Sequence, residues 1–233
     1  MKPPDLAALI FDFDGTLAHT EIDFAEMRRR IFAHLREWGL YHPGVEDGRY
    51  VLELIDWASD QLQDQPERQR RYRQETTQIL HAVELPSCRA ADPFPGVAEA
   101  LQRLRSAGVK IGIVTRNSQA GVGAVLARHP LPYDVLITRD DLRNVKPHRE
   151  HLERALQELN VAPEQALMVG DHATDIQAGQ AAGLRTCGVL TAQTTLQEFH
   201  DLGADMAFAD VPQLVAALLD DKLPCANPCP PAN

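Results

Sequence analysis

Two aspartates close the first apolar segment of the chain, and their spacing suits shared chemistry. Residues 9–14 read LIFDFD, so one residue separates Asp12 from Asp14, and Gly15 and Thr16 follow directly. Side chains two residues apart on a strand point to the same side. As the chain leaves the strand, both carboxylates can therefore reach one reacting group. Such pairs perform general acid–base and nucleophilic chemistry.

Three further polar segments follow apolar runs in the same way. They are residues 115–117 (TRN), 146–147 (KP) and 170–175 (GDHATD). In open parallel sheets, ligands bind beyond the carboxyl ends of the strands, where these segments would meet. Each segment alone also fits a turn or a helix cap. Their joint occurrence, in order along the chain, favours a single site built from all of them.

Short apolar runs alternate with segments of helical periodicity over most of the chain. This alternation predicts an α/β fold, with a Rossmann-like parallel sheet and helices on both of its faces. The expected strands are residues 7–13, 109–114, 134–137, 166–169, 185–190 and, more weakly, 206–208; the expected helices are residues 97–107, 119–129, 148–160, 175–182 and 211–219.

Residues 18–92 break this rhythm, because they show helical periodicity without a convincing strand. The sequence therefore predicts a catalytic core, residues 1–17 and 93–223, with an all-helical cap domain inserted after the first strand. The helices expected in the cap are residues 24–38, 49–62 and 66–85.

Charge and cysteine placement narrow the classes of partner. The 233 residues include 23 basic and 33 acidic side chains, and the net charge of −10 disfavours nucleic acids and anionic membranes as partners. We find no signal peptide or membrane-spanning segment. The four cysteines lack metal-site spacing, so we expect reduced thiols in a cytoplasmic protein. Residues 224–233 (PCANPCPPAN) are expected to be a disordered tail, and the role of its Cys225 and Cys229 is open.

The four polar segments together resemble the haloacid dehalogenase-like hydrolase superfamily. The motifs are DFDGT at residues 12–16, VTRN at 114–117, KP at 146–147 and GDHATD at 170–175. The helical insert is similar to that of the phosphoglycolate phosphatase-like and β-phosphoglucomutase-like group. The resemblance implies that Asp12 is a nucleophile that forms an aspartyl-phosphate, and that Asp14 is the general acid–base. An acid at position 14 favours phosphate-ester hydrolysis or phosphoryl transfer over dehalogenation.

The same resemblance implies a Mg²⁺ ion, which offsets repulsion between the aspartates and a phosphate dianion. Its expected ligands are Asp12, the backbone carbonyl of Asp14, and Asp171. Asp175 is expected to orient a metal-bound water or the Lys146 side chain.

Phosphate binding is expected from the second and third motifs. Lys146 would neutralise charge between nucleophile and phosphate. The Thr115 hydroxyl and the backbone N–H groups of Arg116 and Asn117 would bind phosphate oxygens near a helix start. The Arg116 side chain could instead reach a second anionic group on the substrate or pair with a surface acid, and we favour the substrate group.

Four residues depart from the family pattern or lie in the cap, and they are candidates for substrate specificity. His19 fits a substrate contact and a solvated hinge residue equally well. His172 could contact substrate or tune Asp171, although an ordinary loop hydrogen bond is favoured. Arg28 and Arg49 are the cap arginines that we expect to face the site, whereas most other cap arginines should lie on solvated helix faces beside glutamates.

The sequence thus predicts a Mg²⁺-dependent phosphatase of small phosphorylated metabolites, either phosphoglycolate-like or phosphosugar compounds. The alternatives are a β-phosphoglucomutase-like phosphomutase and a catalytically weak binding or regulatory protein on the same fold. We expect a monomer or weak homodimer that binds neither nucleic acid nor membrane.

Overall fold

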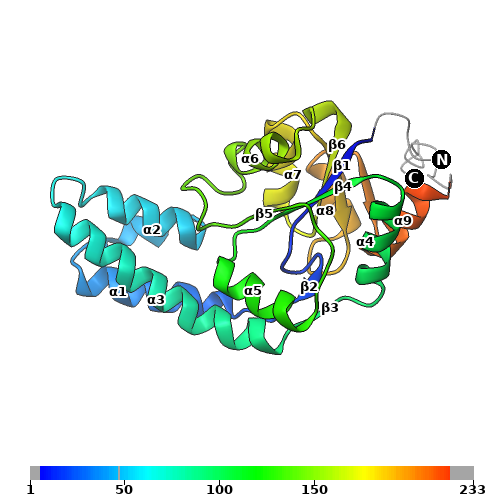
Figure 1. Ribbon diagram of the computed structural model, residues 1–233. Helices are drawn as coiled ribbons and strands as arrows, with labels where there is room; N and C mark the ends of the chain where they lie inside the picture. The colour runs from blue at the N-terminus through cyan, green and yellow to red at the C-terminus, as the bar shows by residue number, and fades with distance from the viewer. Residues whose placement is uncertain (1–5, 47, 221–233) are drawn as a thin grey trace. The chain divides into compact units, whose positions relative to one another are not determined.

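A six-stranded parallel sheet forms the centre of the molecule, with the order β5-β4-β1-β6-β7-β8 (Figure 1). The computed structural model describes residues 6–46 and 48–220. Each predicted strand of the sheet is present, which confirms the α/β fold class. The strands are β1 (Ala8–Phe11), β4 (Lys110–Val114), β5 (Val135–Ile137), β6 (Ala166–Gly170), β7 (Arg185–Val189) and β8 (Met206–Phe208).

Burial on both faces explains why the strands read as unbroken apolar runs. β1 lies between β4 and β6, and its four residues are 0% exposed. A strand that is covered on both faces exposes no side chain to water, so apolar residues are favoured at every position. The expected strand over residues 7–13 is shorter in the structure, because the backbone turns after Phe13, whose carbonyl accepts the N–H groups of Leu17 and Ala18.

Helices cover both faces of this sheet (Figure 1). α6 (Glu150–Leu159) and α7 (Ala173–Ala181) pack on one face, while α4 (Val97–Ser106) packs against α9 (Val211–Leu219) on the other. α5 (Gln119–Arg128) follows β4, and a short 3₁₀ helix, Pro163–Gln165, precedes β6.

One helix of the catalytic part, α8 (Leu196–Asp201), was not predicted. The sequence carries a readable signal for it, because Thr195 and Glu198 form a capping box in which each side chain bonds the backbone of the other.

The chain divides into two compact units, and their boundaries differ from those predicted. The catalytic unit extends to Thr20 and resumes at Ala91, and the helical unit is Glu21–Ala90. The predicted boundaries at 17/18 and 92/93 missed two short strands, β2 (Ala18–His19) and β3 (Asp92–Pro93), which pair antiparallel within the catalytic unit. Two residues are too few to show strand periodicity, so the sequence did not reveal this ribbon.

The helical unit consists of α1 (Phe24–Glu37), α2 (Val51–Asp60) and α3 (Pro66–Ala90), with a 3₁₀ turn at Pro43–Glu46. The prediction that the third helix ends at residue 85 is wrong, because α3 continues through Pro86. Proline removes one helical hydrogen bond. Buried Val83 and Cys88 lie on either side of Pro86, so the packed face of the helix continues past the lost bond.

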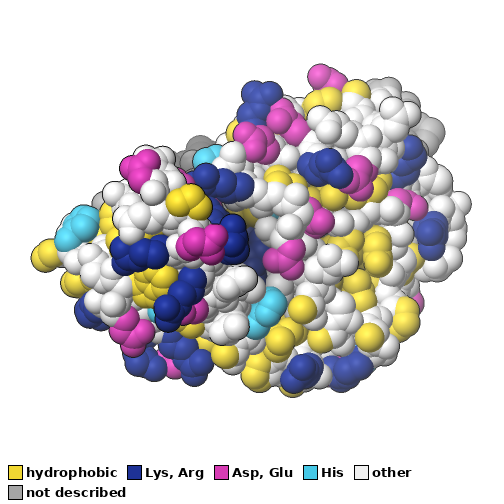
Figure 2. Space-filling view, turned by 60° about the vertical axis from the view of Figure 1, so that its left-hand side comes forward, with side chains coloured by type: hydrophobic (Ala, Val, Ile, Leu, Met, Phe, Trp, Pro, Cys, Tyr) yellow, Lys and Arg dark blue, Asp and Glu magenta, His cyan; other side chains and the backbone are white. Residues whose placement is uncertain are grey.

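Arginines of the helical unit lie mostly beside acids, as the helical spacing predicted. Ion pairs join Arg29 and Arg30 to Glu26, and Arg71 to Glu75. Figure 2 shows basic and acidic side chains interspersed over the face that it draws. Exposed pairs of this kind contribute at most about 1 kcal/mol each, so they influence solubility more than stability.

The cysteine predictions can be compared with the structure only for Cys88 and Cys187, which lie among the described residues. Cys88 and Cys187 are free, buried thiols. The end of the predicted core, at residues 221–223, and the predicted tail with Cys225 and Cys229 lie outside the described residues. Within residues 6–46 and 48–220, no helix is both long enough and apolar enough to cross a membrane.

Two glycine-to-alanine substitutions should change stability in opposite directions. A Cβ at Gly179, inside α7, would overlap the Thr186 methyl group, whereas a Cβ at Gly123, inside α5, would enter open space. We expect Gly179→Ala to lower the free energy of unfolding by about 1–3 kcal/mol through overpacking. Gly123→Ala should raise it by about 0.5–1 kcal/mol through helix propensity. Urea unfolding of both variants tests this, and equal effects would contradict the packing of α7 on β7.

Candidate active site

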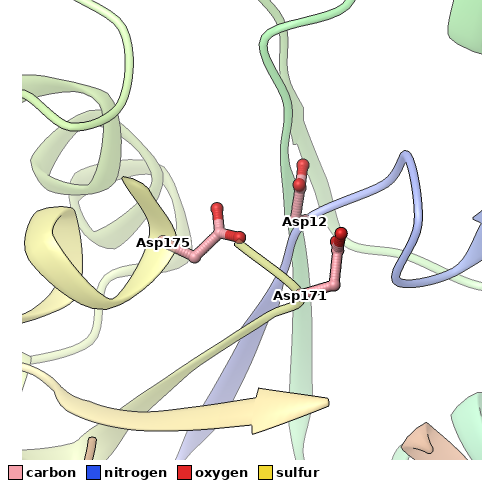
Figure 3. A group of neighbouring side chains, drawn as sticks. All are labelled: Asp12, Asp171 and Asp175. Carbon is pink, nitrogen blue, oxygen red and sulfur yellow. The ribbon is translucent and has the colours of Figure 1, made fainter. Parts of the chain in front are cut away.

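The four polar segments meet at one edge of the sheet. Asp12 follows β1, Thr115 follows β4, and Asp171 follows β6, three strands that are neighbours in the sheet. Lys146 lies between β5 and α6, and Asp175 lies in the first turn of α7. Figure 3 shows Asp12, Asp171 and Asp175 converging from β1, from the turn after β6 and from α7.

A buried lysine links two of these acids. Lys146 Nζ lies 2.8 Å from Asp12 Oδ1 and 2.7 Å from Asp175 Oδ1, and the lysine side chain is 0% exposed. Burial by itself lowers the pKa of Lys146, but the two carboxylates together raise it above its usual value. Burial raises the pKa of Asp12, and Lys146 opposes this rise. The lysine therefore keeps its charge and favours an ionised Asp12.

Asp14 lies in a pocket of hydrogen-bond donors. Its carboxylate accepts bonds from Thr20 Oγ1 (2.7 Å), Asn117 Nδ2 (2.9 Å) and Thr115 Oγ1 (3.1 Å). Burial, followed by the nearby charge of Asp12, raises the pKa of Asp14, and the three donors moderate that rise. A raised pKa suits a carboxyl group that must give up and regain a proton near neutral pH.

Asp171 is held against the first motif. Thr16 Oγ1 donates a hydrogen bond of 2.7 Å to Asp171 Oδ1. Gly15 has a φ of +82°, and a Cβ built there would lie 2.5 Å from Asp171 Oδ2. Only glycine combines this backbone conformation with so close an approach. Burial, then Asp12 and Asp175, raise the pKa of Asp171 to about 8.

The acids fit a divalent cation that prefers oxygen ligands. One carboxylate oxygen each from Asp12, Asp171 and Asp175 lies within 4.8 Å of the others. Both Asp175 oxygens are engaged, Oδ1 by Lys146 and Oδ2 by the His172 backbone N–H. Asp12 Oδ2 and Asp171 Oδ2 receive no hydrogen bond from the described residues. Those two oxygens suit Mg²⁺ best, and Asp175 suits the predicted role of orienting Lys146.

The second motif builds the pocket of Asp14. The Thr115 hydroxyl donates to Asp14 and accepts from the Asn117 backbone N–H at 3.0 Å, and Asn117 Oδ1 accepts from the Ser118 N–H. The Thr115 hydroxyl and the Asn117 N–H, both predicted phosphate ligands, are thus bonded to each other, and phosphate binding by this motif stays a prediction. Arg116 is half-buried and directly follows Thr115. Burial, followed by the charge of Arg116, lowers the pKa of His172, which is the neighbour of Asp171 in the sequence.

The predicted specificity residues have other contacts in the structure. His19 is exposed on β2, with its ring edge-on to Phe94 at 5.6 Å between centroids. His172 caps α7, because its Nδ1 accepts the Thr174 N–H at 3.2 Å. When neutral, the ring of His172 therefore carries its proton on Nε2.

The two cap arginines belong to the helical unit and contact each other. Arg28 donates to the Arg49 carbonyl, and its guanidinium lies over the Phe32 ring. The Arg49 guanidinium lies over Trp57, 5.4 Å from the ring centroid. A substrate contact by either arginine stays a prediction.

The sequence analysis missed two residues that support the catalytic groups. Thr20 donates to Asp14, as described above, and no sequence pattern singles it out. His151 is buried in α6 and accepts the Lys146 backbone N–H at 3.1 Å on Nδ1. Burial lowers the pKa of His151 to about 3, so the ring is a neutral acceptor. A signal existed here, because His151 occupies an apolar position of the helical period that contains Leu152, Ala155, Leu156 and Leu159.

Fold and site together define a class of protein: a parallel α/β sheet with paired aspartates after its first strand and a helical insert. Comparison with known families agrees, since the model for haloacid dehalogenase-like hydrolases matches residues 9–189. The chain belongs to the haloacid dehalogenase-like hydrolase family.

Curated relatives from bacteria carry a more specific name. The pyrophosphatase PpaX of Bacillus thuringiensis strain Al Hakam is 34% identical over 189 residues, which cover 78% of this chain and 82% of the relative. The protein of the same name from Bacillus cereus strain B4264 is 32% identical over 192 residues, with the same coverage.

Solved structures share the fold over nearly the whole chain. A structure from Bacteroides fragilis, assigned as a haloacid dehalogenase-like hydrolase, has a TM-score of 0.65 and 25% identity and covers 90% of this chain and 99% of its own. One from Thermotoga maritima, assigned as a β-phosphoglucomutase, has a TM-score of 0.60 and 25% identity, covering 92% and 99%. One from Haemophilus somnus, assigned as a phosphoglycolate phosphatase, has a TM-score of 0.62 and 21% identity. It covers 91% of this chain and 97% of its own.

The affinity for Mg²⁺ should depend on the protonation of Asp171. Because the pKa of Asp171 is raised to about 8, this carboxyl is mostly protonated at neutral pH and must lose its proton to bind a cation. We expect affinity to rise with pH, by up to about tenfold per unit, and to level off above about pH 8. Calorimetry in buffers of different ionisation heat counts the protons released. An affinity that is flat across this range would contradict the prediction, and Asp171→Asn, which removes this titrating ligand, should lower both the affinity and the number of protons released.

Proposed function

We propose that this chain is a Mg²⁺-dependent phosphatase that hydrolyses small phosphorylated metabolites through an aspartyl-phosphate. The observation that carries the proposal is the pair formed by Asp12 and Asp14. Burial raises the pKa of both carboxyl groups, but Asp12 lies beside a buried lysine that opposes the rise, and Asp14 lies in a pocket of neutral hydrogen-bond donors. Two acids in such different environments suit the roles of nucleophile and proton carrier.

In the first step of the proposed reaction, an Asp12 carboxylate oxygen attacks phosphorus. The bond to the leaving oxygen breaks, and Asp14 gives that oxygen its proton. In the second step, Asp14 takes a proton from water as the water oxygen attacks the aspartyl-phosphate. Inorganic phosphate leaves, and Asp12 is regenerated as a carboxylate. The bound Mg²⁺, held by Asp12 and Asp171, would supply positive charge that stabilises the phosphoryl oxygens.

Lys146 has two tasks in this scheme. Its ammonium group offsets the negative charge of Asp12, so that a phosphate dianion can approach. Asp175, which accepts from the same ammonium, keeps Lys146 oriented toward the nucleophile. Lys146 thus contacts the proposed nucleophile directly and is itself held in place by Asp175.

Two substrate classes deserve direct comparison. Phosphoglycolate-like and phosphosugar monoesters follow from the resemblance of the motifs. Inorganic pyrophosphate is the second candidate, because the Bacillus relatives at 32–34% identity are named pyrophosphatases. A phosphomutase, the remaining enzyme alternative, would instead yield an isomerised sugar phosphate with little free phosphate.

We further propose that the enzyme acts in the cytoplasm as a monomer or weak homodimer, without nucleic-acid or membrane partners. The net charge of −10 supports this, because polyanions would be repelled. Free thiols at Cys88 and Cys187 suit a reducing compartment.

Substitution of the two aspartates tests the reaction. Asp12→Asn should abolish turnover, and Asp14→Asn should lower kcat by about 10²- to 10⁴-fold, the usual contribution of a general acid–base. The measurement is Mg²⁺-dependent phosphate release over a panel of phosphorylated metabolites and pyrophosphate. The control is Asp201→Asn, at an exposed acid of α8, which should keep wild-type rates. Near-normal turnover by Asp12→Asn would reject the nucleophile, and activity insensitive to chelators would reject the metal.

Arg116 should distinguish the substrate classes. Arg116 directly follows Thr115, whose hydroxyl bonds Asp14, and an interaction with a second anionic group contributes about 1.5–3 kcal/mol. We expect Arg116→Ala to lower kcat/KM for pyrophosphate by at least about tenfold, and for a phenyl phosphate much less. Arg149→Ala, at an exposed arginine paired with Glu153, is the matched control. Equal losses on both substrates would contradict this role of Arg116.

A further inference from the structure

The segment between β7 and α8, residues 190–195, contacts the loops that contain Gly15 and Asp171. The proposed reaction assigns no role to this segment. Thr191 Oγ1 donates a hydrogen bond to the Gly15 carbonyl. Thr194 Oγ1 donates one of 2.7 Å to the Asp171 carbonyl. Both threonines are half-buried. Two hydroxyls from one segment thus hold the backbone of the first and the fourth motif.

This segment is itself fixed at both ends. At its start, the Leu190 N–H donates to the Phe208 carbonyl of β8 at 3.0 Å. At its end, Thr195 caps α8 in a capping box with Glu198. Phe199 of α8 is 1% exposed and packs where a Cβ on Gly188 would otherwise lie. The two threonines therefore belong to a segment whose ends are both held by hydrogen bonds.

The two hydroxyls add to a set of contacts that join Asp171 to the first motif. Thr16 holds the Asp171 carboxylate, and Thr194 holds its backbone carbonyl. The Asp171 carboxylate occupies the space that a Cβ on Gly15 would need, so the two residues are closely packed. Thr191 holds the Gly15 carbonyl in turn. Gly15 also directly follows Asp14, whose own carbonyl is an expected metal ligand.

We propose that Thr191 and Thr194 are positioning residues for the divalent cation, because they hold the carbonyl groups of Gly15, the neighbour of the expected ligand Asp14, and of Asp171 in the arrangement that binds it. This inference rests on the metal dependence in the proposed function. Groups that orient metal ligands typically contribute 10- to 100-fold to metal affinity. The hydroxyls bond to the backbone carbonyls of Gly15 and Asp171, so their effect on the cation passes through these two residues.

Cation binding measured without substrate tests the proposal. The variants are Thr191→Val, Thr194→Val and Thr194→Ser, and Mn²⁺ binding is followed by electron paramagnetic resonance and Mg²⁺ binding by calorimetry. We expect each valine variant to raise the Kd at least about tenfold, and Thr194→Ser, which keeps the hydroxyl, to stay near the wild-type Kd. Thr77→Val, which also removes a threonine bond to a backbone carbonyl (2.8 Å, Arg73), is the matched control and should leave the Kd unchanged.

Thermal unfolding of the metal-free variants separates positioning from general stability. A purely structural role would lower the melting temperature of the metal-free protein and leave the Kd of the folded protein unchanged, which would overturn the inference. If Thr194→Val does not fold, Thr194→Ala replaces it and is judged by the same Kd criterion. Wild-type protein that binds neither cation would reject the proposed metal dependence and this inference together. Wild-type binding with unchanged valine variants would reject this inference alone.

Discussion

The buried ammonium group of Lys146 is the interaction on which the site depends. Four acids, Asp12, Asp14, Asp171 and Asp175, crowd the ends of β1 and β6. Carboxylates taken out of water repel one another and lose solvation, and the raised pKa values of Asp12, Asp14 and Asp171 express that cost. Lys146 brings a compensating positive charge, which the four acids cannot supply for themselves. Removing one partner of such a buried pair costs about 3–5 kcal/mol, because the remaining charge is uncompensated.

Sheet topology makes this concentration of charge possible. β1 is hydrogen-bonded to β4 on one side and β6 on the other, so its carboxyl end lies between theirs. Parallel strands end at the same edge, and the helices that follow begin there, with N–H groups available to acids. Asp175 illustrates the consequence, since it accepts the His172 N–H at the start of α7 while accepting from Lys146. Backbone N–H groups of the fold thus stabilise part of the negative charge that is concentrated in the site.

The sequence revealed those parts of the site that leave local patterns. The LIFDFDGT stretch combines a buried strand with two acids, and the structure places both of them in the site, as it does Lys146 and Asp171. Helices with clear periods, such as residues 211–219, were found at their observed bounds. The support around the site escaped prediction, because a threonine that bonds a distant carbonyl, as Thr194 does, is identical in sequence to any surface threonine. The β2–β3 ribbon escaped for the same reason, since its pairing joins residues 18–19 to 92–93.

The unusual stretch AHTE, residues 18–21, takes on a different meaning in the structure. In the sequence, His19 fits a substrate contact and a solvated hinge residue equally well; in the structure it is exposed, with its ring against Phe94, which follows β3. Thr20 is the member that reaches the chemistry, with a 2.7 Å bond to Asp14. It is also the last residue of the catalytic unit before the helical unit begins. A donor to the ionised carboxylate lowers its pKa, so Thr20 favours the basic form of Asp14, which the second step of the proposed hydrolysis needs. A residue that no sequence pattern singles out, at the end of its unit, thus acts on the protonation of the proposed general acid–base.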